Sequence, residues 1–125
     1  MPNSAQFPHD VVDAFNSAKI IGVRSGSDHK YTGVWVVVVN GKVYARSWND
    51  KSTGWFRAFK QEPEGWVQVG SFELPVRVRF PRNAKVLGAV TNAYAQKYNT
   101  KASRKWVEGF AEPARQLTTL EFVPR

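Results

Sequence analysis

The residues best suited to chemistry lie between Arg46 and Arg57, where cations, hydroxyls and aromatic rings alternate along the chain. The candidate residues of this segment are Arg46, Ser47, Trp48, Lys51, Ser52, Trp55 and Arg57. The pattern predicts a turn followed by a helix, and the exposed N–H groups at a helix N-terminus attract anions. We therefore interpret the segment as a site for a flat, phosphate-tailed cofactor whose ring lies against the tryptophans. The alternative is a solvated turn whose hydroxyls only cap the helix.

A second candidate site is the polar loop that begins at Arg24. Its residues Arg24, Ser25, His29 and Lys30 can meet phosphate or substrate oxygens, and its small residues let the backbone approach a ligand. His29 is a weak candidate for a general acid or base near neutral pH, because no second catalytic partner accompanies it in the sequence. The alternative is an ordinary polar connection between two strands.

Composition excludes several classes of site. The chain has 0 cysteines, so it forms no disulfide, zinc-finger cluster, iron–sulfur site or thiol nucleophile. The histidines His9 and His29 are far apart in sequence, and no metal site is predicted. A Ser–His–Asp arrangement is disfavoured because Ser25, Asp28 and His29 are close neighbours in one loop. No Walker loop and no GxGxxG motif are present.

The chain carries 18 Lys+Arg against 10 Asp+Glu, a formal net charge of +8 that suits a polyanion or a phosphate-bearing ligand. Nucleic acid is an alternative partner, since basic residues lie near aromatic ones that can stack on bases. These residues are Arg77, Arg79, Arg82 and Lys85, and then Lys97, Lys101, Arg104 and Lys105 with Tyr98 and Trp106. We favour a solvated basic face with inward-turned aromatics, because no nucleic-acid-binding motif is present.

The elements that must position these side chains follow from hydrophobic periodicity and turn residues. Helices are predicted over residues 7–17, between Trp55 and Pro63, over residues 86–98, and in a short segment that begins at Ser103. Strands are predicted over residues 19–24, 31–39, 42–48, 66–70, 72–80 and 117–123. This order predicts a single α+β domain over residues 1–125, a small antiparallel split β-barrel of about six strands with flanking helices. Residues 1–6 are expected to form a flexible N-terminus.

The run from Val34 to Val39 is apolar on both faces, which predicts cover on both sides. The cover is either the helix over 86–98 or a second subunit. No apolar run approaches the roughly 18–20 residues that span a bilayer, and the first residues lack the features of a signal peptide. We expect a soluble, cytoplasmic protein.

Six short segments carry a resemblance to a known family. They are Ile21–Gly26, the Trp35 strand with its Asn40-Gly41 turn, Arg46–Trp48, Gly54–Phe59, Leu74–Val78 and Thr118–Pro124. Over roughly residues 15–124 the chain resembles a bacterial family of small uncharacterised proteins, a domain of unknown function. That family brings no known activity.

More distantly, the layout is similar to the flavin- and deazaflavin-binding split barrels, relatives of pyridoxamine-phosphate oxidase. Arg24-Ser25-Gly26 matches a loop of the deazaflavin-dependent nitroreductase branch, and Trp55-Phe56 matches its aromatic pair. Arg46-Ser47 and Lys51-Ser52 lie where its Ser/Lys turn falls. The final Leu-Glu-Pro of that branch is altered here, because Phe122-Val123 separate Glu121 from Pro124.

The resemblance implies FMN or a deazaflavin as cofactor, oxidoreductase or nitroreductase-like activity, and a homodimer. Two alternatives stay open, a non-catalytic module that binds a small molecule and a nucleic-acid-binding protein.

Overall fold

A computed structural model describes residues 6–48, 51 and 53–125. Its elements are α1 (His9–Ser17), β1 (Ile21–Ser25), β2 (Thr32–Val34), β3 (Val37–Val39), β4 (Lys42–Arg46), α2 (Trp55–Gln61), β5 (Glu64–Val69), β6 (Phe72–Arg79), α3 (Ala84–Lys97), α4 (Arg104–Phe110), α5 (Pro113–Gln116) and β7 (Thr119–Pro124). The short helix α5 has no counterpart in the sequence prediction, because four residues are too few to display a helical period.

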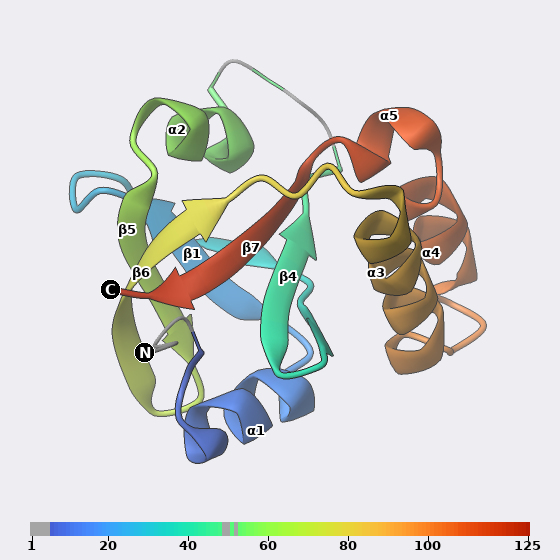
Figure 1. Cartoon of the computed structure of the whole chain (residues 1–125), viewed down its shortest axis with the longest axis horizontal. Helices are drawn as coiled ribbons and strands as arrows, with labels where there is room; N and C mark the ends of the chain where they lie inside the picture. Colours follow the sequence, from blue (N-terminus) through green and yellow to red (C-terminus); the bar gives the residue numbers. More distant parts are fainter. Residues whose placement is uncertain (1–5, 49–50, 52) are drawn as a thin grey trace.

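The strands form one 7-stranded sheet in the order β2-β1-β5-β6-β7-β4-β3. All neighbouring strands pair antiparallel, and the sheet curls strongly on itself (Figure 1). This confirms the predicted α+β split barrel with flanking helices. The described residues contain seven strands, where about six were expected.

The extra strand arises because the predicted strand over residues 31–39 is broken at Trp35 and Val36. Its first part, β2, pairs with β1, and its second part, β3, pairs with β4 at the other end of the sheet order. The prediction of one continuous strand was therefore wrong. This bent segment joins the two ends of the curled sheet.

Helix α3 satisfies the backbone groups that the break leaves without a strand partner. The Val36 N–H donates to the Tyr98 hydroxyl at 3.0 Å. The Tyr94 hydroxyl donates to the Trp35 carbonyl at 3.3 Å, and Lys97 Nζ donates to the Val36 carbonyl at 2.8 Å. Buried backbone groups need such partners, so these side chains stabilise a bend that an isolated strand would not adopt.

Two apolar clusters cover the two faces of this segment. Val34 and Val36 belong to the barrel interior, with Phe15, Phe59 and Phe122. The outward-facing Val37 packs instead with residues of β4, α3 and α4, namely Tyr44, Val90, Tyr94, Tyr98 and Phe110. The predicted cover on both faces is confirmed, and the outer cover comes from the chain's own α3.

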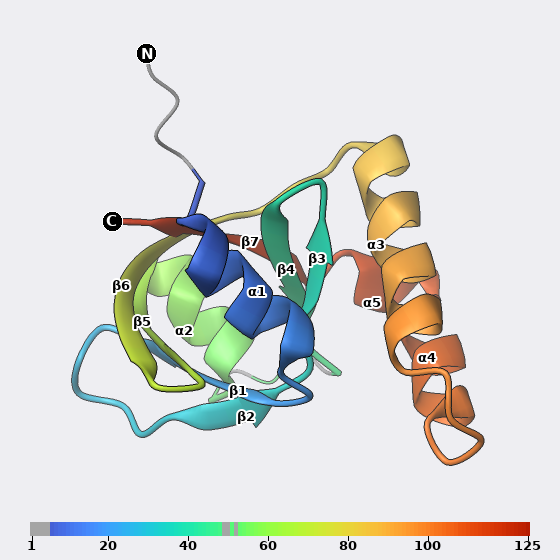
Figure 2. The same cartoon turned by 90° about the horizontal axis from the view of Figure 1, so that it is seen from below.

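Three of the helices lie together beside the barrel, and the other two lie apart from each other. Figure 1 shows α3, α4 and α5 together on one side, with α1 and α2 at opposite ends of the barrel, and Figure 2 shows α3 beside α4 from below. The Asn40-Gly41 turn joins β3 to β4, with φ values of 52° and 77° that fit the predicted type I′ hairpin. No helix within the described ranges has the length and apolar character needed to cross a bilayer.

Candidate functional site

An aromatic pocket of about 310 Å³ lies where the bent strand, the end of β4, the start of α2 and helix α4 meet. Four of the chain's five tryptophans line it. The lining residues are Ile20, Gly33, Val34, Trp35, Arg46, Trp48, Trp55, Trp106 and Phe110. Its walls are therefore flat aromatic faces and edges, with one buried cation among them.

The pocket walls are held by ring contacts behind them. Trp35 stacks on the buried Tyr98 ring with centroids 4.0 Å apart and planes 2° apart. Trp48 meets Trp106 at 4.8 Å and Phe110 at 5.4 Å, both edge to face. Such pairs contribute about 0.5–1.5 kcal/mol each beyond their buried area, so they stabilise this part of the pocket wall.

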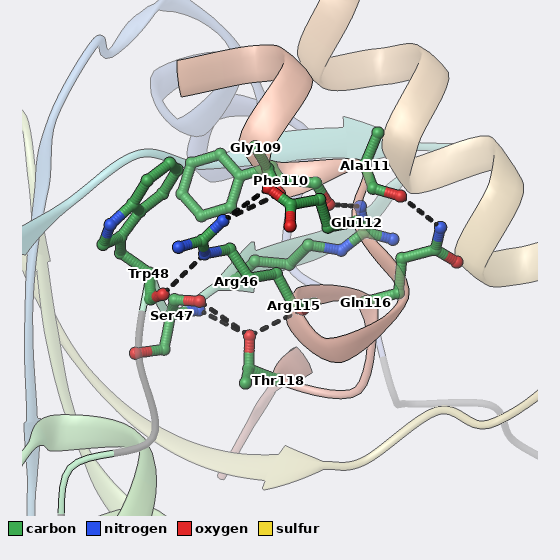
Figure 3. Close-up of polar contacts among 10 residues, drawn as sticks. All are labelled: Arg46, Ser47, Trp48, Gly109, Phe110, Ala111, Glu112, Arg115, Gln116 and Thr118. Atoms are coloured by element: carbon green, nitrogen blue, oxygen red, sulfur yellow. Dashed lines mark hydrogen bonds and ion pairs between the residues drawn. The ribbon is translucent and has the colours of Figure 1, made fainter. Parts of the chain in front are cut away.

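Trp48 is fixed most tightly, by contacts from α4 and α5 (Figure 3). The Arg115 guanidinium carbon lies 3.6 Å from the centre of the indole ring, and Arg115 Nε donates to the Trp48 carbonyl at 2.7 Å. A Cβ atom at Gly109 would lie 2.3 Å from the Trp48 ring. Only glycine leaves room for the indole in this position.

Arg46 lies beneath the pocket and is 2% exposed. Its guanidinium donates to Thr119 Oγ1, Thr91 Oγ1 and the Leu87 carbonyl, each at 2.7 Å, and to the Phe110 carbonyl at 2.9 Å. Burial lowers the pKa of Arg46 to about 10. The side chain therefore ties β4 to α3, α4 and β7, and four of its five N–H groups donate to protein acceptors.

A smaller basic pocket of about 100 Å³ adjoins the aromatic one, since Trp55 lines both. Arg24, Ser25, His29 and Lys30 line it, together with Thr53 and Gly54 at the start of α2. The loop from Arg24 and the start of α2, singled out separately in the sequence, thus meet in one place.

Arg24 is the one described residue whose buried side-chain donor has no hydrogen-bond partner. The unsatisfied atom is Nε, and the guanidinium carbon lies 4.6 Å from the Tyr31 ring centre. A buried donor without an acceptor costs about 1–3 kcal/mol. Arg24 is also one of the residues that line the basic pocket.

Ser25 has a different position from the one expected of a ligand contact. It is 2% exposed, and its hydroxyl lies 3.0 Å from the Ala58 carbonyl and 2.7 Å from the Glu62 carbonyl. The hydroxyl therefore fastens β1 to α2, although the residue also lines the basic pocket.

The other predicted residues of the 46–57 segment do not all reach a pocket. Ser47 is buried, and its N–H donates to Thr118 Oγ1 at 3.1 Å. Lys51 and Arg57 are exposed and line neither pocket. Ser52 lies outside the described residues.

Sequence reasoning missed six residues of the aromatic pocket, namely Ile20, Gly33, Val34, Trp35, Trp106 and Phe110. The signal for Trp106 and Phe110 was present, because aromatic residues four positions apart lie on one helix face. Nothing in the sequence indicated that this face turns toward Trp48.

Several residues considered as contacts to nucleic acid are already engaged within the protein. Tyr98 is 4% exposed and stacks inside the protein on Trp35. Arg77 pairs with Glu64, and Lys97 donates to two backbone carbonyls. Across the described ranges, no group of three or more potential metal ligands is present.

Comparison with solved structures gives related folds at low identity. A conserved hypothetical protein from Mycobacterium tuberculosis has a TM-score of 0.62 at 12% identity, covering 100% of this chain and 84% of that one. An F420-H2 dependent reductase has a TM-score of 0.60 at 20% identity, covering 84% and 93%. A FAD-binding protein from Mesorhizobium loti has a TM-score of 0.54 at 13% identity, covering 92% and 86%.

At such identities these likenesses concern the fold, a split barrel. No curated protein matches the sequence. A family model described as an uncharacterised protein conserved in bacteria (DUF2255) matches residues 11–122, nearly the whole chain. The chain therefore belongs to the DUF2255 family.

Proposed function

We propose that the chain binds a flat, conjugated cofactor with a phosphate tail, of the FMN or deazaflavin type, and serves as an oxidoreductase. The observation that carries this proposal is the pairing of two pockets through Trp55, one lined by four tryptophans and one by Arg24, His29 and Lys30. An apolar slot suits a fused ring system, and a cationic pocket beside it suits a phosphate.

The volumes of the two pockets indicate the size of cofactor that fits them. A cavity of about 310 Å³ is near the lower end of small-molecule sites, which span roughly 300–1,000 Å³. This volume matches a fused ring system better than a whole dinucleotide. The 100 Å³ pocket has room for a single phosphate group. A mononucleotide-type cofactor is thus favoured over FAD, whose second nucleotide would have to lie outside.

The residues take three roles in this proposal. Trp35, Trp48 and Trp55 sandwich and orient the ring, while the Arg24 guanidinium, whose Nε lacks an acceptor, meets the phosphate. Arg46 frames the slot from beneath. When bound, the cofactor supplies the hydride chemistry, and the protein supplies orientation and excludes water. The names of two structural neighbours, an F420-H2 dependent reductase and a FAD-binding protein, support this class.

The first experiment is an absorption spectrum and a native mass spectrum of freshly purified protein. A co-purifying yellow chromophore is the expected result, and the same spectrum tests the homodimer that the resemblance implies. Colourless protein is then titrated with FMN, a deazaflavin and FAD while tryptophan fluorescence is followed. The absence of binding by all three would refute the proposal.

Matched variants test the site. Trp55→Ala removes the wall shared by both pockets, and it should weaken FMN or deazaflavin binding roughly 10- to 100-fold, since one ring stack contributes about 1–3 kcal/mol. Arg24→Met should weaken binding of a phosphorylated cofactor more than binding of riboflavin. Trp66→Ala is the control, because Trp66 lies outside both pockets against Arg125.

A redox assay distinguishes the oxidoreductase from a non-catalytic binding module. The bound cofactor should be reduced or reoxidised faster on the protein than free in solution. Binding with an unchanged rate would favour the binding module.

A further inference from the structure

Arg46 is the one ionisable side chain among the described residues that line the aromatic pocket. The other lining groups are the four tryptophans, a phenylalanine, two aliphatic side chains and a glycine. The pKa of Arg46 is lowered by burial only to about 10, so the side chain is a cation at neutral pH. The pocket therefore holds a fixed positive charge within otherwise apolar walls.

This charge has no carboxylate beside it. The four acceptors that the guanidinium reaches are all uncharged, being the hydroxyls of Thr91 and Thr119 and the carbonyls of Leu87 and Phe110. Of the ion pairs between described residues, none includes Arg46. Neutral acceptors satisfy N–H groups but leave the unit charge in place. Because Arg46 is 2% exposed, salt and water screen that charge only weakly.

The other titratable groups around Arg46 do not cancel its charge. Arg115 lies behind the Trp48 ring, 3.6 Å from the ring centre, and is paired with Glu112 at 2.9 Å (Figure 3). The Arg46 N–H donates to the Tyr94 hydroxyl at 2.9 Å, and burial raises the pKa of Tyr94, so this phenol stays neutral. The field inside the pocket is therefore positive.

The size of this effect follows from Coulomb's law. An anion about 6 Å from Arg46, at an effective dielectric constant of about 20, is favoured over a neutral group by on the order of 100-fold. Loss of hydration by the entering anion offsets part of this gain. We expect a net preference of roughly tenfold or more.

From this geometry we propose that the aromatic pocket selects ring ligands that carry a negative charge, with Arg46 as the residue that determines this specificity. Phenolates and other ring anions are the chemical class that it favours. The inference deepens the proposed function and rests on it, because it concerns the same ring slot. Under that function, the pocket favours whichever oxidation state of the cofactor ring is an anion.

The probe is para-nitrophenol, which ionises near neutral pH and whose phenolate, unlike the neutral phenol, absorbs visible light. A pH titration with excess protein gives the pKa of the bound probe. If the phenolate binds at least about tenfold more tightly than the phenol, this pKa falls by about one unit or more below that of the free probe. An unchanged or raised pKa, or no binding of either form, would overturn the proposal.

Arg46→Met tests the residue. Without the cation, the apolar pocket disfavours the anion, so the pKa of the bound probe should rise above that of the free probe. The ratio of the two affinities is the readout, because a merely structural change weakens binding of both forms alike. Arg46→Gln also removes the charge and replaces the methionine variant if circular dichroism shows that variant to be unfolded. A lowered pKa that persists in either folded variant would refute the role of Arg46.

Arg24→Met is the matched control, because Arg24 lines the basic pocket and not the aromatic one. The lowered pKa of the bound probe should persist in this variant, and its loss would assign the preference to the basic pocket instead. The test requires no flavin. Failure of FMN, a deazaflavin and FAD to bind refutes the proposed function, whereas an unshifted pKa of bound para-nitrophenol refutes the charge preference alone.

Discussion

Replacing Arg46 by lysine should destabilise the protein more than replacing it by methionine, although lysine preserves the charge. The reason lies in how the buried guanidinium is satisfied. Its planar group reaches four acceptors in different directions, whereas an ammonium is a point charge with three donors. Lysine would keep a desolvated cation and lose part of its hydrogen bonding.

The magnitude follows from the acceptors. In Arg46→Met, Thr91 Oγ1 keeps its bond to the Leu87 carbonyl at 3.1 Å, and Thr119 Oγ1 keeps its bond to the Gln116 carbonyl. Mainly the Phe110 carbonyl then loses its partner, at a cost of about 1–3 kcal/mol. Methionine also removes the cation whose burial lowers the Arg46 pKa.

In Arg46→Lys the charge stays buried with too few partners, and the desolvation penalty of an ion in a protein interior is several kcal/mol. Urea denaturation at pH 7 should therefore rank the proteins as wild type, then Arg46→Met, then Arg46→Lys, with the variants separated by roughly 2 kcal/mol. Thermal midpoints should follow the same order. A lysine variant as stable as wild type, or more stable than the methionine variant, would refute this account of Arg46.

Three other perturbations have defined outcomes. Gly65→Ala puts a Cβ 2.1 Å from the Arg24 carbonyl across the β1–β5 pair, so the unfolding free energy should fall by roughly 3 kcal/mol or more. A loss below about 1 kcal/mol in urea denaturation would contradict this contact. Gly109→Ala should displace the Trp48 ring and weaken the near-ultraviolet circular dichroism of the tryptophans while far-ultraviolet spectra stay unchanged; an unaltered near-ultraviolet spectrum would speak against the packing. The folded-state pKa of Lys97 is about 8, so between pH 8 and the ordinary lysine range the unfolded chain binds more protons than the folded protein. The unfolding free energy of the wild type relative to Lys97→Met should therefore rise with pH over that range, by up to about 1.4 kcal/mol per pH unit. A difference that does not change with pH would exclude a depressed pKa.

Local sequence signals predicted most of the barrel. The alternation from Phe72 to Phe80 and the Asn40-Gly41 turn each specify a structure through their own residues, and both appear as expected. The break at Trp35 and Val36 could not be read in this way, because the run of valines around it contains no proline, glycine or polar residue after Val34. The break depends on hydroxyls contributed by Tyr94 and Tyr98, about 60 residues later in the chain.

Residue types alone indicated which side chains could line a pocket, but not what those side chains contact. Arg24, Trp48 and Trp55 line the pockets as their residue types indicated. Arg46 was expected to contact a phosphate, whereas four of its five N–H groups donate to protein acceptors. Sequence shows that a cation is present; the acceptors around it come from α3, α4 and β7, whose convergence depends on the whole fold.

The two tyrosine hydroxyls at the break have a consequence for how the family can diversify. They occupy the place of a neighbouring strand at the seam of the barrel, and Gly33, Val34 and Trp35 of that seam line the aromatic pocket. A change from tyrosine to phenylalanine removes one oxygen atom and leaves the ring packing intact. A single-atom change at Tyr94 or Tyr98 can thus alter how this seam is held, without altering a residue that lines the pocket.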